Sequence, residues 1–386
     1  MTKTATAYSN ERDPSVAADD LANQISLSMK SPHALLVFAS SQYDYVSVLQ
    51  VLTGRFPESL LVGCSSAGEF TTKGLGEGSI SVFALSSDEM AFSASLAENI
   101  SSRPEAAAKE LLAGFRGFSD AKYRYRTALI LNDALAGSAD ELVHMLNVHT
   151  GGKYKFFGGG AGDDAAFTRT HVFCGMRVAS NAAVALEILS TKPIGVGVRH
   201  GWVPATEPMR VTSSSGSMVD SLDAVSTVEV FEHYAEETGQ NLDIGAPLPF
   251  FLHNIAGIKL DSGYKLRVPL GIDGEGAVSF AAEIPQGSAV SIMCATAHSS
   301  TAAAREATED ALRQLGGSKP VGALLFDCVA TRLRLGKEFG NEVQAVQKAL
   351  GNIPLAGCNT YGQVASAEGQ FTGFHNCTAV ICVFPE

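Results

Sequence analysis

Short apolar runs bounded by polar residues recur along the chain. Three of them, Ala34–Phe38, Ala128–Leu131 and Ala323–Phe326, are too short for helices and have the continuous apolar character of strands buried on both faces. Each follows an alanine-rich stretch whose apolar residues are spaced three and four apart, which predicts a helix packed on one side. The apolar positions of these helices are Ala17, Leu21 and Ile25, then Ala108, Leu111, Phe115 and Phe118, then Ala304, Ala307, Ala311 and Leu315.

The segments that follow each predicted strand also repeat. A second helical pattern comes first, then a glycine-rich turn, then another strand. These last strands are Ile80–Leu85, Val184–Leu189 and Ala379–Phe384. Three units, at about residues 14–100, 104–190 and 299–384, therefore have the order helix, strand, helix, strand, turn, strand. This order predicts an α/β fold in which repeated helix-strand-helix-strand-strand units form layered sheets.

The stretch between the second and third units follows a different pattern. Residues 194–297 contain strand-like runs at Ile194–Val198, Met209–Thr212, Tyr264–Val268, Ala277–Ala282 and Ala289–Cys294. They are separated by turn dipeptides, and one helix is predicted over Thr227–Glu237. We interpret this as a β-rich middle section, and we expect a pocket between it and the repeated units, since pockets favour domain junctions.

Composition and charge narrow the classes of partner. Apolar residues make up 46% of the chain and charged residues 18%, which indicates a well-packed globular protein. The net charge of −12 argues against nucleic acid and anionic membrane as partners. Met1–Ser15 is polar, and no run approaches the ~18 apolar residues of a membrane span. We therefore expect a cytoplasmic protein without membrane insertion.

The cysteines give no metal or disulfide pattern. They are odd in number, lie singly, and include no C-x-x-C spacing. The seven are Cys64, Cys174, Cys294, Cys328, Cys358, Cys377 and Cys382. We interpret them as buried reduced thiols, with structural zinc or disulfides as the alternatives.

Two glycine-rich turns share a motif across almost the whole chain. Leu61–Phe70 and Leu355–Val364 both read L-x-G-C-x-[ST]-x-G, and Phe157–Asp164 is a degenerate third copy. Such turns can expose backbone N–H groups and hydroxyls to an anion or a small polar ligand. The candidate ligand-binding residues are Gly63, Cys64, Ser65, Ser66, Gly68, Glu69, Gly357, Cys358, Asn359, Tyr361, Gly362 and His375. The alternative is that the glycines only allow strands and helices to approach closely.

An enzymatic interpretation is weaker. Ser65 lies in a segment similar to the G-x-S-x-G nucleophile elbow, but Ala67 stands where the second glycine is required. No His or Asp partner for Ser65 can be assigned from the sequence, which weakens the hydrolase interpretation. We therefore expect a non-enzymatic protein, with a hydrolase that uses Ser65 or Cys64 as the alternative. Gly158–Gly162 lacks the spacing of a dinucleotide-binding loop, and no Walker A sequence is present.

Several motifs together resemble a known domain pair. They are Val62–Glu69, Phe157–Asp164, His200–Pro204 followed by Val211–Thr212, Leu355–Gly362 and Phe374–Thr378. In this order they are similar to the FIST N and FIST C domains. The resemblance runs from about residue 30 to 384, with FIST N over 30–222 and FIST C over 223–384. It implies a sensory protein that binds a small ligand and works with a histidine kinase, a cyclic-di-GMP enzyme or a chemotaxis protein. One departure is Gln363, where the family often has glutamate.

The resemblance also suggests a cofactor. Because the domain pair accounts for the chain, we expect signalling through a separate partner. FIST proteins of this size resemble the NosP group of nitric-oxide sensors, which bind b-type haem through a histidine. His253 and His233 have apolar and aromatic neighbours in sequence and are the alternative candidate iron ligands. His200 and His375 belong to the general motifs. A sensor of a small metabolite such as an amino acid, without haem, is the other main hypothesis.

Overall fold

The computed structural model describes residues 1–386 except 121, 262 and 367–371. Most of the chain folds into three similar units. The first contains β1 (Thr2–Ser9), α1 (Pro14–Ser26), β2 (Ala34–Ser40), α2 (Tyr45–Arg55), β3 (Leu60–Ser66) and β6 (Ile80–Ser87). The second contains β7 (Met90–Glu98), α3 (Pro104–Ala113), β8 (Tyr125–Asn132), α4 (Ala139–Thr150), β9 (Lys155–Gly160) and β12 (Ala182–Ser190). The third contains β13 (Gly195–Arg199), α7 (Ala297–Arg313), β23 (Pro320–Cys328), α9 (Phe339–Leu350), β24 (Leu355–Thr360) and β27 (Ala379–Pro385).

The three units form sheets with the same strand order. In each, the first strand pairs with the last, the last with the second, and the second with the third: β1-β6-β2-β3, β7-β12-β8-β9 and β13-β27-β23-β24. The second and third strands are parallel, and the other pairs are antiparallel. The parallel pairing lets the connecting helices cover one face of each sheet, as in other crossover units.

Each unit also gives a hairpin to another unit. The hairpins are β4–β5 (Glu69–Thr71 and Gly74–Gly76), β10–β11 (Val172–Cys174 and Arg177–Ala179) and β25–β26 (Gln363–Ser366 and Thr372–His375). The first unit's hairpin pairs with β24 of the third unit, the second unit's with β3 of the first, and the third unit's with β9 of the second. The exchange is cyclic, so the turns that lead into the hairpins are drawn to one region. We call these three units the triplicated body.

The core has a central part and three outer parts. The inner faces of the three sheets share one cluster, in which the Phe326 ring lies 5.5 Å from that of Phe38 and 6.2 Å from that of Phe157. The outer faces are covered by the helices of their own units. Leu21 of α1, for example, is fully buried in the outer core of the first unit. Both faces of the central strands are therefore buried, which explains their continuous apolar sequence.

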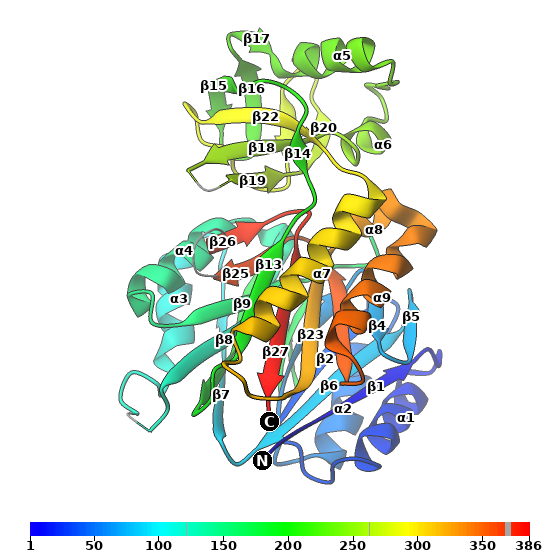
Figure 1. The fold of residues 1–386 in the computed structure, drawn as a ribbon, viewed down its shortest axis with the longest axis vertical. Coiled ribbons are helices and arrows are strands. Elements are labelled where there is room, and N and C mark those ends of the chain that lie inside the picture. The colour runs from blue at the N-terminus through cyan, green and yellow to red at the C-terminus, as the bar shows by residue number, and fades with distance from the viewer. Residues whose placement is uncertain (121, 262, 367–371) are drawn as a thin grey trace.

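A second domain is inserted between β13 and α7 and lies at one end of the body (Figure 1). Its strands are β14 (Val203–Pro204), β15 (Met209–Ser215), β16 (Met218–Leu222), β17 (Val225–Ser226), β18 (Ile255–Leu260), β19 (Gly263–Arg267), β20 (Pro269–Ile272), β21 (Val278–Phe280) and β22 (Ala289–Cys294). Its helices are α5 (Thr227–Thr238) and α6 (Leu248–Phe251). It has a core of its own, in which Phe231 packs 5.2 Å from Phe251. We call it the β-rich domain.

The predicted fold class is confirmed, with two differences. Each unit begins with an additional strand, of which β1 and β7 were not predicted from the sequence. β13 corresponds to the run at residues 194–198, which was placed in the β-rich section but belongs to the third unit. A short helix, α8 (Val329–Leu335), also follows β23 unexpectedly. Within the described residues, every helix is too short or too polar to cross a membrane.

Candidate functional site

The three glycine-rich turns meet in the centre of the triplicated body. The Ala67 N–H donates to the Asn359 carbonyl at 3.0 Å, which joins the first turn to the third. The Gly162 N–H donates to Ser65 O at 2.9 Å, and the Tyr361 N–H to Gly160 O at 2.9 Å. These contacts follow the same cycle as the hairpin exchange. The exchange therefore brings the three turns together.

The first glycine of each turn has a packing role. A Cβ atom at Gly63, Gly158 or Gly357 would lie 2.0, 2.1 or 1.9 Å from a carbonyl oxygen of the neighbouring parallel strand. No side chain fits at such a distance without moving the backbone. Close approach of strands thus explains Gly63 and Gly357, as the alternative interpretation of the turns required.

Most of the other predicted turn residues are buried at this junction and are not among the described residues that line the interdomain cavity discussed below. Those with no exposed surface are Cys64, Ser65, Ser66, Glu69, Cys358 and Asn359. Ser65 Oγ accepts a hydrogen bond from the backbone N–H of His171 at 2.9 Å, not from an imidazole. A nucleophile at Ser65 or Cys64 does not fit this buried arrangement, because substrate has no access to it. Gly68 is likewise closed off by the Arg332 guanidinium, which lies where its Cβ would be.

Glu69 and Gln363 occupy equivalent positions inside the fold. Glu69 accepts hydrogen bonds from Ser66 Oγ at 2.5 Å and from Ser79 N and Oγ at 3.0 and 2.7 Å. Gln363 accepts from the Thr378 N–H at 3.2 Å and donates to Thr360 Oγ1 at 2.9 Å. Burial raises the pKa of Glu69 to about 7 despite these hydrogen bonds. The Glu69 carboxyl group is thus hydrogen-bonded inside the fold and does not line the cavity described below.

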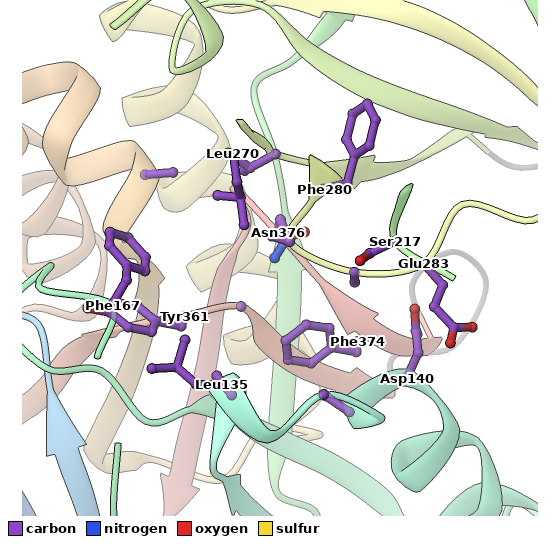
Figure 2. Close-up of a pocket in the computed structure, with 18 of the residues that line it drawn as sticks. Leu135, Asp140, Phe167, Ser217, Leu270, Phe280, Glu283, Tyr361, Phe374 and Asn376 are labelled. Atoms are coloured by element: carbon purple, nitrogen blue, oxygen red, sulfur yellow. The ribbon is translucent and has the colours of Figure 1, made fainter. Parts of the chain in front are cut away.

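Two predicted residues, Tyr361 and Gly362, line a cavity of about 560 Å³ at the junction of the triplicated body and the β-rich domain. The body contributes η1 (Ala134–Ala136), the start of α4, α8 and β26, and the β-rich domain contributes α6, β20 and β21. Figure 2 shows side chains from both parts pointing into this space. The predicted pocket between domains is thus present.

One end of the cavity is apolar. Leu135, Phe167, Leu270 and Leu333 line it, and their side chains remain 41%, 40%, 40% and 37% exposed. The Phe167 ring stacks on that of Tyr361 at 4.5 Å (Figure 2). Large apolar side chains that stay half-exposed around a recess are typical of a site that another molecule covers.

The segment that carries Phe167 has an unusual backbone. Asp164, Ala165 and Phe167 have φ values of 55°, 65° and 53°, a region that residues other than glycine rarely adopt. Asp163 holds this segment: its carboxylate accepts from the Phe167 and Arg169 N–H groups, each at 2.8 Å, and from the Tyr361 hydroxyl. Strain that is fixed in this way is often found at binding sites.

The other end of the cavity carries charged groups. Asp140 and Glu283 lie together there, away from Phe167 (Figure 2), and Glu141 completes the acidic set. Asp140 is paired with Lys265 at 2.6 Å and with Arg267, which are both in the β-rich domain. Glu141 and Glu283 are exposed and remain available to a cationic or hydrogen-bond-donating group.

Asn376 adds a polar group to the apolar part of the wall. Its side chain is 98% buried, and its Oδ1 atom has no hydrogen-bond partner among the described residues. A buried acceptor without a partner costs about 1–3 kcal/mol, which a donor on a bound molecule would recover. The sequence analysis missed Asn376 as a site residue, as it did Asp140, Phe167 and Cys328, since none of them belongs to the glycine-rich motif.

The histidines lie outside the cavity. The His233 side chain is 72% exposed, and its Nε2 lies 3.1 Å from Glu237. His253 is also exposed. His375 is buried beside Lys265 and Arg267, and burial lowers its pKa well below the ordinary value. The two candidate iron ligands, His233 and His253, therefore face solvent, and no histidine is among the described cavity-lining residues. A histidine-ligated haem does not fit this site.

Comparison with known proteins identifies the family. The FIST N domain model matches residues 33–225 and the FIST C domain model residues 227–366. Two uncharacterized proteins of Mycobacterium tuberculosis, MT0656 of strain CDC 1551 and Rv0628c of strain H37Rv, are each 25% identical over 272 residues, covering 68% of this chain and 70% of theirs.

Solved structures show only distant likeness. A cyanuric acid hydrolase from A. caulinodans is 8% identical with a TM-score of 0.35, over 100% of both chains. A phosphoribosylformylglycinamidine synthase II from Thermotoga maritima is 10% identical with a TM-score of 0.23, over 99% of this chain and 71% of its own. These values carry no argument about activity. The two domain matches together span most of the sequence, and the chain therefore belongs to the FIST family of sensory and signalling proteins.

Proposed function

We propose that this FIST protein is a sensor that binds a small molecule in the cavity between the triplicated body and the β-rich domain, and that it signals to a separate protein. The observation that carries the proposal is the cavity itself. Its volume of about 560 Å³ falls in the ~300–1,000 Å³ range of small-molecule sites, and both domains line it.

The lining favours a ligand with an apolar body and a donor group. Phe167, Leu270 and Leu333 offer apolar contact, so a ligand that covers them gains about 25 cal/mol for each Å² of apolar surface removed from water. Asn376 Oδ1 and the carboxylate of Glu283 accept hydrogen bonds. An amine or an amino acid with an apolar side chain matches both features.

A ligand in this position would bias the arrangement of the two domains. It would contact Tyr361 in the body and Leu270 in the β-rich domain at the same time. Any difference in affinity between two arrangements shifts their populations by the same free energy. The signal to a partner is then a change in how the β-rich domain is held against the body.

A thermal-shift screen of apolar amines and amino acids tests the proposal. A ligand present at about 100 times its Kd stabilises the folded state by about 2.7 kcal/mol. The Leu270→Trp variant fills the apolar end and should abolish the shift. Leu260→Trp is the matched control, because Leu260 is 42% exposed on β18 and does not line the cavity. If a stabilising compound works equally well on both variants, the cavity is not its site.

Nitric oxide sensing through b-type haem is the other function that the resemblance suggested. His233 and His253 do not support it, since both are exposed and neither lines the cavity. Titration with haemin tests it separately. Loss of the Soret band in His253→Ala or His233→Ala would support that histidine as the haem ligand. A band unchanged in both variants would exclude these two residues as axial ligands.

A further inference from the structure

Two cysteines from different strands meet at the wall of the cavity. Cys328 ends β23 and lines the cavity, and Cys377 lies two residues before β27. β23 and β27 are antiparallel neighbours, with Phe326 opposite Val380. The end of β23 and the start of β27 therefore bring the two cysteines close together. Both are almost fully buried, and the cavity is the approach to Cys328.

The repeat shows what kind of position Cys328 occupies. The strand residue opposite the first turn glycine is Val37, Ile130 or Leu325 in the three units. Three residues further on stand Ser40, Asp133 and Cys328, respectively. Cys328 is therefore the counterpart of a hydroxyl in the first unit and of a carboxylate in the second.

The second unit shows how this position holds a negative charge. The Asp133 carboxylate accepts from the Leu135 N–H at 3.1 Å and from the Asn181 N–H at 2.5 Å. The matching residues of the third unit are Ala330 and Cys377, whose N–H groups face the Cys328 sulfur. The third unit thus places a sulfur atom where the second unit places an anion.

The backbone at Cys377 is built for this contact. Its φ is 52°, and the equivalent residues Gly78 and Asn181 have φ values of 70° and 48°. Glycine and asparagine adopt this region readily, whereas cysteine does so at a cost. The thiol thus stands at a position where the other two units have the residues best suited to this backbone conformation.

The two thiols differ in protonation. The Cys377 thiol, the nearby N–H groups and the Gln363 side chain together lower the pKa of Cys328 to about 6, although burial opposes them. Burial and the neighbouring Cys328 raise the pKa of Cys377 well above its usual value. At neutral pH the pair is therefore one thiolate and one thiol, the combination found in redox-active cysteine pairs.

We propose that Cys328 is a hydroperoxide-reactive nucleophile in the cavity wall and that Cys377 resolves it into an intramolecular disulfide. The Cys328 thiolate attacks the terminal peroxide oxygen, which keeps its hydrogen, and the O–O bond breaks. The other oxygen leaves as an alkoxide or hydroxide, which takes a proton from solvent to give an alcohol or water. The product is a sulfenic acid on Cys328. The Cys377 sulfur then attacks it, the S–S bond forms, and hydroxide leaves as water with the proton from Cys377.

Two observations point to a small oxidant at this position. The apolar lining gives an alkyl hydroperoxide a binding surface next to Cys328. Asn376 Oδ1, in the residue adjacent to Cys377, has no partner among the described residues and can accept from the hydroperoxide O–H. The hydroperoxide would occupy the same cavity as the sensed ligand proposed above, but disulfide formation and ligand binding are measured separately, so each proposal can fail without the other.

Intact-mass and peptide analysis of the full chain after treatment with cumene hydroperoxide tests the proposal. The reduced protein should lose two hydrogens and yield one Cys328–Cys377 disulfide. Cys377→Gly, taken from the first unit, should stop at the Cys328 sulfenic acid, which dimedone traps. It should form that acid more slowly at neutral pH, because it lacks the Cys377 thiol that lowers the pKa of Cys328. Cys328→Ser, also taken from the first unit, should give no product. Because these substitutions copy residues that the fold already accepts, loss of folding is not expected. Cysteines modified in both variants alike would overturn the assignment.

Cys174 supplies an internal control. It is more exposed than Cys328, but burial raises its pKa. If exposure alone set reactivity, Cys174 would be oxidised first. The proposal predicts that Cys328 reacts first, with a rate that reaches half its maximum near pH 6. A rate that still rises steeply up to pH 9 would contradict it.

Gln363 is a positioning residue for this thiolate. Gln363→Leu removes the side-chain amide that hydrogen-bonds the Cys328 sulfur, and should therefore raise the pKa of Cys328. An upward shift of about one unit lowers the thiolate fraction at pH 6 roughly fivefold. The midpoint of the pH–rate profile should therefore move upward, which a merely structural role would not cause. An unchanged midpoint would remove Gln363 from the account.

Discussion

The ion pair between Arg267 and Asp140 joins the two domains beside the cavity, and we predict that Asp140→Ala weakens this junction. The Arg267 side chain on β19 is 1% exposed, and Asp140 on α4 is 20% exposed. Arg267 also donates to the carbonyls of Glu283 and Leu266, each at 3.0 Å, and of Phe374 at 3.3 Å. Without Asp140 the Arg267 guanidinium keeps its hydrogen bonds to these three carbonyl groups but loses the carboxylate that balances its charge.

The magnitude follows from that geometry. Removing one partner of a buried ion pair costs about 3–5 kcal/mol. The partial exposure of Asp140 and the three remaining carbonyl acceptors place this case lower, at about 2–3 kcal/mol. Replacing both residues in Asp140→Ala/Arg267→Met removes the buried charge as well, so most of the lost stability should return.

Urea unfolding followed by Trp202 fluorescence measures the effect. Trp202 is the one tryptophan of the sequence, and it is buried in a cluster that includes Leu266 of the β-rich domain and Cys328 of the body. Asp19→Ala is the control, because Asp19 forms an exposed pair with Arg55, of the kind that contributes little. A loss below about 0.5 kcal/mol in Asp140→Ala, or no recovery in the double variant, would refute the reasoning.

Two further predictions concern the repeats. Because the folded-state pKa of Glu69 is raised to about 7, the native protein holds this proton, and its contribution to stability falls as pH rises from about 4.5 to 7. Glu69→Gln, which copies Gln363, should therefore stabilise the protein by on the order of 2–3 kcal/mol at pH 8 and have little effect at pH 4.5, as urea midpoints at both pH values would show. An equal effect at both pH values would contradict a titration of Glu69. Gly357→Ala should destabilise the protein by about 1–3 kcal/mol, because its Cβ would clash with a backbone carbonyl. Gly54→Ala, on α2 with no atom near the added Cβ, should stabilise it by roughly 0.5–1 kcal/mol in the same assay. Similar effects of the two alanine substitutions would refute the close-approach explanation.

The repeated fold could be predicted because its signals are local. Pro14 and Pro104 each begin a helix, as their fixed φ permits, and the runs beginning at Ala34 and Ala323 form central strands. The first strands of the first two units were not predicted, and that of the third was predicted but assigned to the β-rich section. The sequence of β1, TKTATAYS, is mostly polar and so lacks the apolar run that indicated the central strands. An edge strand needs apolar residues on only one face.

The site could be predicted only in part. Tyr361 and Gly362 line the cavity, but the turn residues around Ser65 are covered by turns from other units, and that depends on the hairpin exchange. Pairing between segments over a hundred residues apart leaves no periodic signal in one sequence. Cys328 could have been noticed, because an alignment of the three repeats gives it the same position as Asp133 of the second unit. A buried cysteine by itself, however, suggests only packing.

The central claim is that the space between the two domains holds a small molecule. Native mass spectrometry of the protein after incubation with a dialysable metabolite extract tests it most directly. The account predicts one adduct per chain, absent from Leu270→Trp and retained in Leu260→Trp. An unadducted wild-type protein, or an adduct that survives Leu270→Trp, would contradict it.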